Sequence, residues 1–397
     1  MSVSLPRKDL FDIPEGVIYL DGNSLGPLPR AVPARMADMI GAEWGGRLIR
    51  GWNDAGWMAQ PGRVGDTVAR LIGAAPGTVT MGDTLSVKVY QTLAAALAMR
   101  PGRRVVLSDT GNFPTDLYMA DGLMETLDQG HTLRTVAPEE VAGAIDDTVA
   151  AVLLTEVDYR TGRRHDMEAI TARARGAGAI MIWDLAHSAG AVPVDLAGCG
   201  AEFAVGCTYK YLNGGPGAPA FVYVRPDLIE GVRPALAGWM GHAAPFAFER
   251  GYRPAPSIER MRVGTPPVLQ MTALEAALTV WEGVDMAELR AASLALSERF
   301  IGEVEARCPA LTLASPRDGA MRGSQVSFAC EHGYAAMQAL IDRGVIGDFR
   351  QPDLMRFGFT PLYLDEEDVV AAVDVLATVL DGRLWDDPAY LAVKGVT

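Results

Sequence analysis

Asp184 and Lys210 are the two residues of this chain whose types and positions best fit a shared chemistry. Asp184 ends the apolar run 179–183, and Lys210 follows a second apolar run, 203–206. In an α/β protein such runs are buried strands, and active sites form where the carboxyl ends of neighbouring strands meet. Pyridoxal phosphate (PLP) needs a lysine for its Schiff base and a carboxylate that keeps its pyridine nitrogen protonated. The pair therefore predicts a PLP site.

The residues around this pair favour the same interpretation. Lys210 follows Tyr209 and precedes the glycine-rich segment 214–217, which lets the backbone approach a bulky ligand closely. Taken alone, Lys210 could be a surface lysine, Asp184 could cap a helix, and His187 could be an ordinary buried histidine. Taken together, an acid on the pyridine nitrogen and a nearby imidazole would make the cofactor ring an electron sink.

Two further segments could hold other parts of the cofactor. The segment 83–86 leads into a predicted helix over 86–98, so the backbone N–H groups of its first turn and the Ser86 hydroxyl could bind a phosphate or simply cap the helix. Phe113 follows another predicted strand and could stack on a pyridine ring or pack in the core. Asp116 could contact the substituents of that ring.

Arg356 is the candidate for binding the carboxylate of a substrate. It lies in the Phe- and Gly-rich segment 354–363. Arginine can make two parallel hydrogen bonds to a carboxylate, which suits the α-carboxylate of an amino acid. The alternative is a surface ion pair, which would contribute little.

An alternation of strands and helices is predicted to position these residues. The predicted strands cover 104–107, 149–155, 179–184, 203–207 and 218–224, and the helices among them include 86–98 and 167–175. Short, fully apolar strands that alternate with helices indicate an α/β fold with a mainly parallel sheet covered on both faces.

The chain is predicted to divide into three parts. Residues 1–60 form an N-terminal segment that contributes to a small domain and to the active site. Residues 61–285 form the large cofactor-binding domain, and residues 286–397 form a small α+β domain. Helices are predicted in the second half of the chain at 269–282, 286–308, 333–343 and 366–380.

Composition excludes several classes of protein. The length of 397 residues fits two to three domains, and 49% hydrophobic with 21% charged residues is a globular composition. A net charge of −14 argues against nucleic acid as a main partner. Residues 1–16 lack a signal-peptide core, and no apolar run approaches the ~18 residues that span a membrane. We therefore expect a soluble, cytoplasmic protein with no membrane partner.

The four cysteines and five histidines lack the spacing of a metal site or a disulfide framework. We expect buried thiols and no bound metal, although one thiol could lie near the site. The cysteines are Cys199, Cys207, Cys308 and Cys330.

The chain resembles the bacterial members of the kynureninase family, as the order and number of its motifs indicate. Kynureninases are PLP-dependent hydrolases of tryptophan catabolism. The resemblance covers nearly the whole length. It rests on the segments 19–27, 51–53, 112–118, 183–195, 205–220, 238–249, 264–267 and 356–363.

The resemblance implies fold type I of the PLP-dependent enzymes, the aspartate aminotransferase superfamily, with a seven-stranded sheet and an obligate homodimer with shared active sites. The residues implied to contact the cofactor are Leu85, Ser86, Phe113, Asp116, Thr155, Asp184, His187, Tyr209 and Lys210, together with Trp239 and Thr265 from the partner subunit. The residues implied to contact the substrate are Arg356, Ser24, Trp52, His242 and Phe246.

The implied reaction is the hydrolysis of L-kynurenine to anthranilate and L-alanine, with 3-hydroxykynurenine as a further candidate substrate. Lys210 would form the Schiff base and remove the α-proton, Asp184 would hold the pyridinium, and Tyr209 would act as acid or base when the carbon–carbon bond breaks. One departure from the family pattern is Lys88, where the family usually carries Asn. We expect Lys88 to point away from the phosphate.

Other enzymes of the same fold are the nearest alternatives. A class V aminotransferase would not break a carbon–carbon bond, and a cysteine desulfurase would need a mobile nucleophilic cysteine, whereas Cys330 follows an apparent strand. A non-catalytic regulatory protein is disfavoured because Lys210, Asp184 and Arg356 are all present and no DNA-binding module is appended. A nicotinamide dehydrogenase is disfavoured because no G-x-G-x-x-G follows the first strand.

Overall fold

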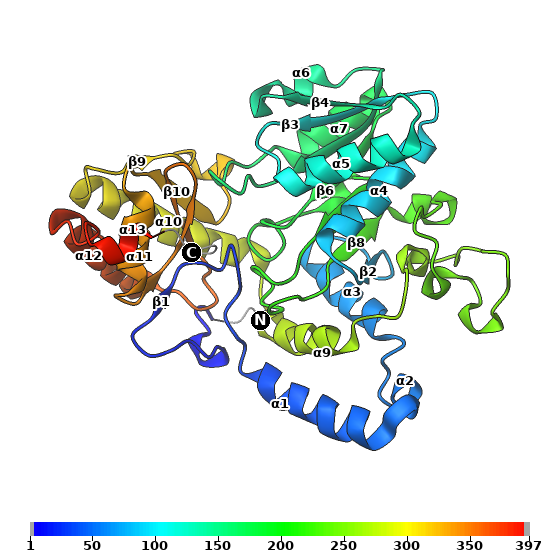
Figure 1. The fold of residues 1–397 in the computed structure, drawn as a ribbon, viewed down its shortest axis with the longest axis horizontal. Coiled ribbons are helices and arrows are strands. Elements are labelled where there is room, and N and C mark those ends of the chain that lie inside the picture. Colours follow the sequence, from blue (N-terminus) through cyan, green and yellow to red (C-terminus); the bar gives the residue numbers. More distant parts are fainter. Residues whose placement is uncertain (1–3, 393–397) are drawn as a thin grey trace.

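The computed structural model describes residues 4–392, in which a large and a smaller β-sheet lie side by side (Figure 1). The large sheet has seven strands in the order β2-β8-β7-β6-β5-β3-β4. Its strands are β2 Val79–Met81, β3 Val105–Asp109, β4 Thr132–Val136, β5 Val149–Thr155, β6 Ile180–Asp184, β7 Phe203–Gly206 and β8 Phe221–Val224. The pairings that join β4, β3, β5, β6 and β7 are parallel, and only β8 runs antiparallel to both of its neighbours. The predicted α/β fold with a mainly parallel seven-stranded sheet is confirmed.

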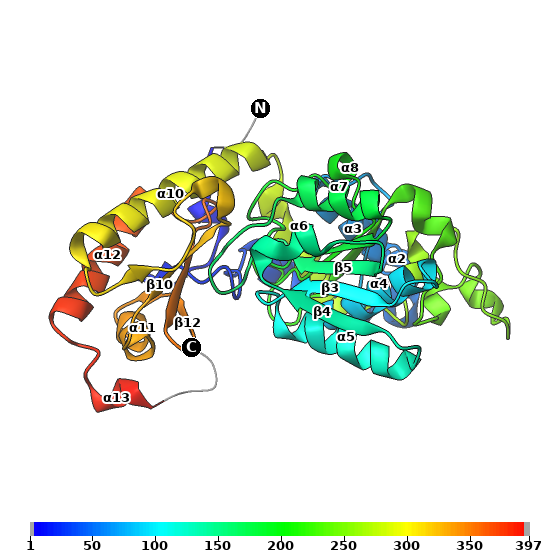
Figure 2. The ribbon, with the colours of Figure 1, turned by 90° about the horizontal axis from the view of Figure 1, so that it is seen from above.

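Each face of this sheet has its own apolar core, because successive residues of a strand point to opposite faces. Leu154 of β5 belongs to the core beneath α3, α7 and α9, whereas Leu153 belongs to the core beneath α4 and α5. Figure 2 shows α7 and α5 on opposite sides of the strands. These helices are α3 Gln60–Leu71, α4 Leu85–Met99, α5 Pro114–Leu127, α7 Met167–Ala177 and α9 Val268–Ala277, and the short helices α6 Val141–Ala144 and α8 Leu196–Cys199 lie in the connections.

The smaller sheet is antiparallel and has four strands in the order β12-β13-β10-β9. Its strands are β9 Thr312–Leu313, β10 Gln325–Ala329, β12 Asp348–Arg350 and β13 Leu354–Gly358. The helices of this part of the chain are α10 Met286–Arg307, α11 Gly333–Ile341, α12 Glu366–Asp381 and α13 Pro388–Leu391. Phe300 of α10 and Phe328 of β10 pack ring against ring, with centroids 6.1 Å apart, so the helix covers the sheet through large apolar side chains.

The N-terminal segment contacts both parts of the molecule. β1 (Ile18–Tyr19) pairs in parallel with β11 (Val345–Ile346), next to the smaller sheet. α1 (Ala31–Asp38) then lies along α9 (Figure 1), and a π-helical stretch leads on to α2 (Gly51–Asp54). The predicted limits of the three parts stay a prediction, and their ends at residues 1 and 397 fall outside the described residues.

Several predicted elements differ from the structure at their ends. The strand predicted over 218–224 begins only at Phe221, because Pro219 has no N–H to donate to a neighbouring strand. The helix predicted over 269–282 ends at Ala277 and continues as a 3₁₀ turn over Leu278–Trp281. No helix among the described residues combines the length and the apolar composition that crossing a membrane requires.

Candidate active site

Asp184 and Thr155 end adjacent strands and therefore lie side by side. They face each other in the register of β6 and β5. Asp184 is buried, and its Oδ1 accepts a hydrogen bond from the backbone N–H of Ala186 at 2.8 Å, while the Thr155 hydroxyl lies 3.4 Å from its Oδ2. Asp184 thus holds a turn rather than the start of a helix. Burial raises the pKa of Asp184 to about 6, although the positive charge of Lys210 acts to lower it.

Asp116, in the first turn of α5, brings a second carboxyl group to the same place. It is buried, and neither of its carboxylate oxygens has a hydrogen-bond partner among the described residues. Burial and the nearby Asp184 together raise the pKa of Asp116 well above its usual value. Two buried carboxyl groups, of which Asp116 lacks a hydrogen-bond donor among the described residues, suit a ligand with a protonated ring nitrogen, as in PLP, because a cationic N–H favours the charged form.

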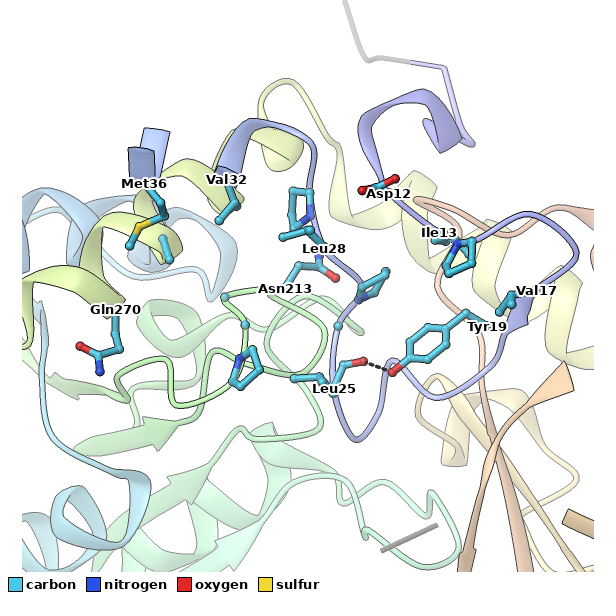
Figure 3. Close-up of a pocket in the computed structure, with 18 of the residues that line it drawn as sticks. Asp12, Ile13, Val17, Tyr19, Leu25, Leu28, Val32, Met36, Asn213 and Gln270 are labelled. Carbon is cyan, nitrogen blue, oxygen red and sulfur yellow. Dashed lines mark hydrogen bonds between the residues drawn. The ribbon is translucent and has the colours of Figure 1, made fainter. Parts of the chain in front are cut away.

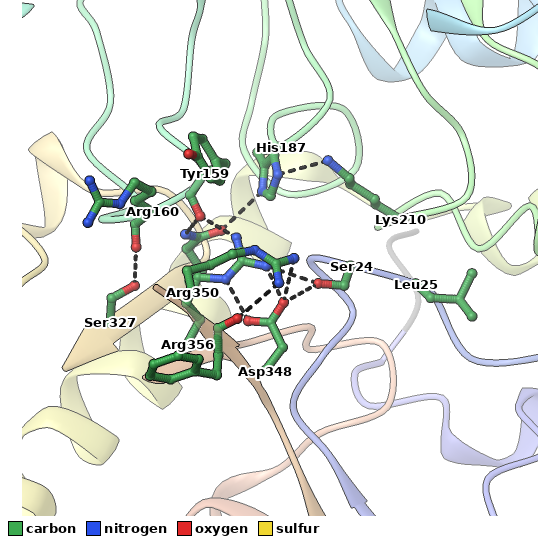
Figure 4. A network of polar contacts seen from close by, with 12 residues as sticks. Ser24, Leu25, Tyr159, Arg160, His187, Lys210, Ser327, Asp348, Arg350 and Arg356 are labelled. Carbon is green, nitrogen blue, oxygen red and sulfur yellow. Dashed lines mark hydrogen bonds and ion pairs between the residues drawn. The ribbon is translucent and has the colours of Figure 1, made fainter. Parts of the chain in front are cut away.

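Lys210 reaches into the site and contacts His187. Its Nζ lies 2.8 Å from His187 Nε2, so it is not a surface lysine whose head points to water. Burial and the positive charges of Lys210 and Arg356 hold the pKa of His187 well below its usual value. His187 is therefore a neutral imidazole that can accept a hydrogen bond from the lysine (Figure 4).

Tyr209 lies beside Lys210 and stays protonated. The neighbouring Cys207 and partial burial both raise the pKa of the Tyr209 phenol above its usual value. Cys207 is itself buried, as predicted for the thiols, and burial raises its pKa too. A phenol in this state is a proton donor at neutral pH and not a ready base.

The first turn of α4 has the free groups that a phosphate needs. The helix begins at Leu85, and the side chain of its N-cap residue, Thr84, makes no capping bond. Half-buried Leu85 and Ser86 therefore present backbone N–H groups and a hydroxyl at the positive end of a helix. Lys88 is fully buried, and its Nζ lies 3.0 Å from both Asp83 and Gln91, whereas its orientation relative to a phosphate stays a prediction.

Phe113 lies at the edge of the site and not in the core. Its side chain is 41% exposed and meets the Tyr159 ring edge to face, with centroids 5.2 Å apart. Asn112 fixes this loop, since its Oδ1 accepts hydrogen bonds from the Thr155 hydroxyl at 2.5 Å and from the backbone N–H of Phe113 at 2.7 Å. The sequence analysis did not single out Asn112, although it lies in one of the family motifs.

Arg356 is fully buried, which contradicts the alternative of a surface ion pair. Its guanidinium makes two hydrogen bonds to the carboxylate of Asp348, of which the Nε–Oδ1 bond is 2.6 Å, and donates to Ser24 at 3.0 Å and to the carbonyl of Tyr159. Arg350 lies 2.9 Å from the same carboxylate. Figure 4 shows these side chains gathered opposite His187 and Lys210.

Two guanidinium groups thus share one carboxylate. Although burial acts to raise the pKa of Asp348, the bonds from Arg356 and the charge of Arg350 hold it below its usual value. Burial and the charge of Asp348 raise the pKa of nearby Asp21 to about 7. Asp348 balances only one of the two guanidinium charges, and the protonated form of Asp21 leaves the other free for a substrate carboxylate to balance.

Comparison with known proteins shows to which family the chain belongs. A family model described as the kynureninase C-terminal domain matches residues 289–376. Kynureninase from Pseudomonas fluorescens is 52% identical over 399 residues, which cover 99% of this chain and 96% of that protein. The chain belongs to the kynureninase family.

Solved structures show the fold that kynureninases share with other enzymes. A cysteine desulfurase from Thermococcus onnurineus NA1 matches with a TM-score of 0.81 at 20% identity, over 96% of this chain and 99% of that chain. A C-DES variant with glycine covalently linked to its PLP cofactor matches with a TM-score of 0.79 at 19% identity, over 94% of this chain and 99% of that chain. The protein is thus a PLP-dependent enzyme of fold type I.

Four residues predicted from the kynureninase pattern make contacts with side chains or backbone groups outside the Lys210 site. Trp239 meets the Phe246 ring edge to face at 5.7 Å, and they are 39% and 60% exposed. Trp52 packs in the same way on Trp57. His242 is buried and bonds to the backbone of its own loop, and Thr265 is exposed. Ser24, implied to contact the substrate, accepts a hydrogen bond from the Arg356 guanidinium.

An apolar cavity of about 540 Å³ lies between the N-terminal segment, α1, α9 and the loop that follows Lys210 (Figure 3). Tyr19 and Leu25 line it and are joined by a hydrogen bond of 2.7 Å. Its lining does not include Lys210, Asp184 or Arg356, so the cavity is separate from the candidate active site of this kynureninase-family chain.

Proposed function

We propose that the protein hydrolyses L-kynurenine to anthranilate and L-alanine with PLP as its cofactor. Membership of the kynureninase family supports this reaction. The observation that carries it is that one site brings together a lysine, two buried carboxyl groups and a buried arginine. They are Lys210, Asp116, Asp184 and Arg356.

The residues present fit the cofactor at each of its ends. Lys210 would hold it covalently, Asp184 and Asp116 would bind its ring nitrogen, and the first turn of α4 with Ser86 would bind its phosphate. Phe113 would cover the ring. PLP, when bound, supplies an electron-accepting ring that stabilises negative charge at the α-carbon of the substrate.

The side chains around that ring would then move the protons. Lys210 Nζ removes the proton from the substrate's α-carbon, while the neutral imidazole of His187 accepts a hydrogen bond that holds the amine in place. Water adds to the side-chain ketone, and its atoms end in the carboxylate of anthranilate and the methyl group of alanine. Tyr209 is protonated before this step and is positioned to give its proton as the carbon–carbon bond breaks.

Arg356 would bind the α-carboxylate of the substrate and so fix which bond breaks. It is already held by Asp348, Ser24 and the carbonyl of Tyr159, so its guanidinium plane is oriented before the substrate arrives. Such preorganisation lowers the entropic cost of aligning the substrate.

We further propose a homodimer in which each subunit completes the site of the other. Trp239 and Thr265 are exposed and therefore accessible to a partner subunit, which supports a role in the partner's site. Trp52, His242 and Phe246 would contact the aromatic ring of the substrate. A cytoplasmic location and the use of 3-hydroxykynurenine as a second substrate stay predictions.

A desulfurase activity is disfavoured by the state of Cys330. This thiol is 8% exposed, and its backbone N–H is fixed by a 2.9 Å bond to the carbonyl of Asp353. Burial raises its pKa, so it is neither mobile nor activated as a nucleophile.

The test is the fluorescence of anthranilate when the purified protein is mixed with PLP and L-kynurenine. We expect fluorescence to rise with the wild-type chain, and activity to fall by at least about 1000-fold in Lys210→Ala, since the covalent bond and the proton acceptor are both lost. Lys210→Arg is the matched control, because it keeps the charge but should be equally inactive. Wild-type protein that binds PLP and gives no anthranilate would contradict the proposal.

A further inference from the structure

We propose that Gln325 is a positioning residue that fixes the tautomer of His187 and thereby holds the amine of Lys210. Gln325 is the first residue of β10, far from Lys210 in the sequence, and its side chain is fully buried. It bonds to His187 on one side and to the backbone of Tyr159 on the other. The role of the amine in catalysis rests on the proposed function, whereas the tautomer does not.

The orientation of the Gln325 amide follows from the groups around it. The carbonyl oxygen of Tyr159 can only accept a hydrogen bond, so the amide atom 2.9 Å away must be the Nε2 donor. The amide oxygen therefore faces His187 Nδ1, at 3.0 Å.

The orientation of the amide in turn decides the protonation of the imidazole. Since the Gln325 oxygen can only accept, His187 Nδ1 must carry a proton. In a neutral imidazole the other nitrogen, Nε2, then has a lone pair, and this atom lies 2.8 Å from Lys210 Nζ. The amine of Lys210 therefore donates to His187, and the direction of every hydrogen bond from Tyr159 to Lys210 is set.

The carbonyl of Tyr159 also joins this chain of hydrogen bonds to Arg356, the residue proposed to bind the substrate carboxylate. Tyr159 O accepts from both Gln325 Nε2 and Arg356. Gln325 and Arg356 come from β10 and β13, which are adjacent strands of the smaller sheet. The small sheet thus positions the group that would bind the substrate and, through Gln325, the amine that would take its proton.

The first experiment is the ¹⁵N NMR spectrum of histidine-labelled, cofactor-free protein. The chain has only five histidines, and the His187 signals are identified by their loss in His187→Asn. We expect Nδ1 of His187 to be protonated and Nε2 to be unprotonated in the wild-type chain. A proton on Nε2 instead would overturn the proposal without any change to Gln325.

The second experiment replaces the amide. Gln325→Met keeps a similar length but makes no bond to His187 or Tyr159, and we expect a mixture of His187 tautomers. In the holoenzyme kcat should fall by about tenfold with KM for L-kynurenine nearly unchanged, since the amine is misplaced while Arg356 remains. An unchanged tautomer in a folded Gln325→Met protein would overturn the proposal.

Ser327→Ala is the matched control, because Ser327 lies on the same strand. Its hydroxyl donates to the carbonyl of Arg160 at 2.5 Å, and so it also ties β10 to this loop without touching His187. We expect its spectrum and kcat to match the wild-type chain. Equal effects in Ser327→Ala and Gln325→Met would assign the loss to the attachment of the strand, and would overturn the role of the amide. Because the spectra need no substrate, they remain decisive if L-kynurenine proves not to be hydrolysed.

Discussion

At the scale of single residues, the protonation of Asp116 and that of Asp184 depend on each other. Two carboxyl groups buried in the same place cannot both be ionised at low cost, so one of them retains its proton until a cation is supplied. This arrangement would be a defect in a protein without a ligand. In a PLP enzyme it favours a protonated ring nitrogen, because that nitrogen provides the missing donor.

The pair makes the stability of the cofactor-free protein depend on pH. A carboxyl group whose pKa is raised on folding stabilises the fold fully below its unfolded value of about 4. That contribution is lost as the pH rises through about 6, the value for Asp184. We therefore expect Asp116→Asn to melt at a higher temperature than the wild-type protein near pH 8, and at a similar temperature near pH 4.

Scanning calorimetry of the cofactor-free proteins at both pH values checks this expectation. The control is Asp121→Asn, since Asp121 is exposed on the same helix, α5, and should leave the melting temperature unchanged. If Asp116→Asn gave the same shift at both pH values, the two carboxyl groups would not be coupled.

Single residues were predictable where a motif or a strand end marked them, as for Asp184 and Lys210. The burial of Arg356 was not, because its partner Asp348 lies on a different strand, β12, and local sequence carries no information on that pairing. Gln325 was missed for the same reason: it contacts His187 across 138 positions of sequence. Long-range polar partners depend on tertiary packing, which periodicity does not report.

At the scale of elements, the start of α4 is built to receive an anion. A helix N-terminus leaves backbone N–H groups without partners, and a side-chain cap normally satisfies some of them. Here Thr84 makes no such bond, so the first turn is available to a phosphate. The Ser86 hydroxyl lies in that turn.

We expect Ser86→Ala to raise the Kd for PLP by about tenfold, the cost of one hydrogen bond to a charged group. Titration of cofactor-free protein with PLP, followed by absorbance, measures this change. Ser86→Thr retains a hydroxyl and should restore most of the affinity. An unchanged Kd in Ser86→Ala would assign the phosphate to other groups.

The strands were predictable where a long apolar run marks them. β5 is buried along its whole length and was predicted with its observed bounds, since a fully apolar run has few alternatives. β4 is an edge strand with partly exposed residues, and β2 has only three residues, so neither produced a pattern. Where a strand was overextended, at Ala218, a proline lies inside the predicted run.

At the scale of the whole molecule, one subunit leaves large apolar side chains exposed. Leu48, Ile49 and Phe248 are 64%, 78% and 76% exposed, and Trp44 is 52% exposed. Such a density of exposed aromatic and aliphatic groups is typical of a surface that another protein covers. Trp239 and Phe246 lie in the same loop region as Phe248, so a covering subunit would also meet predicted site residues.

Shared sites in a homodimer predict that two inactive proteins can restore each other. In mixed dimers of Lys210→Ala with the double variant Trp239→Ala/Thr265→Ala, one of the two sites would have all its native residues. Random exchange makes half of the dimers mixed, so activity should reach about a quarter of the wild-type value. Anthranilate release after the two proteins are unfolded and refolded together measures this recovery.

The control for this experiment follows from the network around Gln325. Arg356 is joined to Lys210 within one chain through Tyr159, Gln325 and His187, so both residues should act in the same site. A mixture of Lys210→Ala with Arg356→Lys therefore contains no dimer with a fully native site, and it should show no recovery. Recovery in both mixtures would point to refolding and not to shared sites. Recovery in neither would mean that Trp239 and Thr265 serve the subunit that carries them, and each site would then be complete within a single chain.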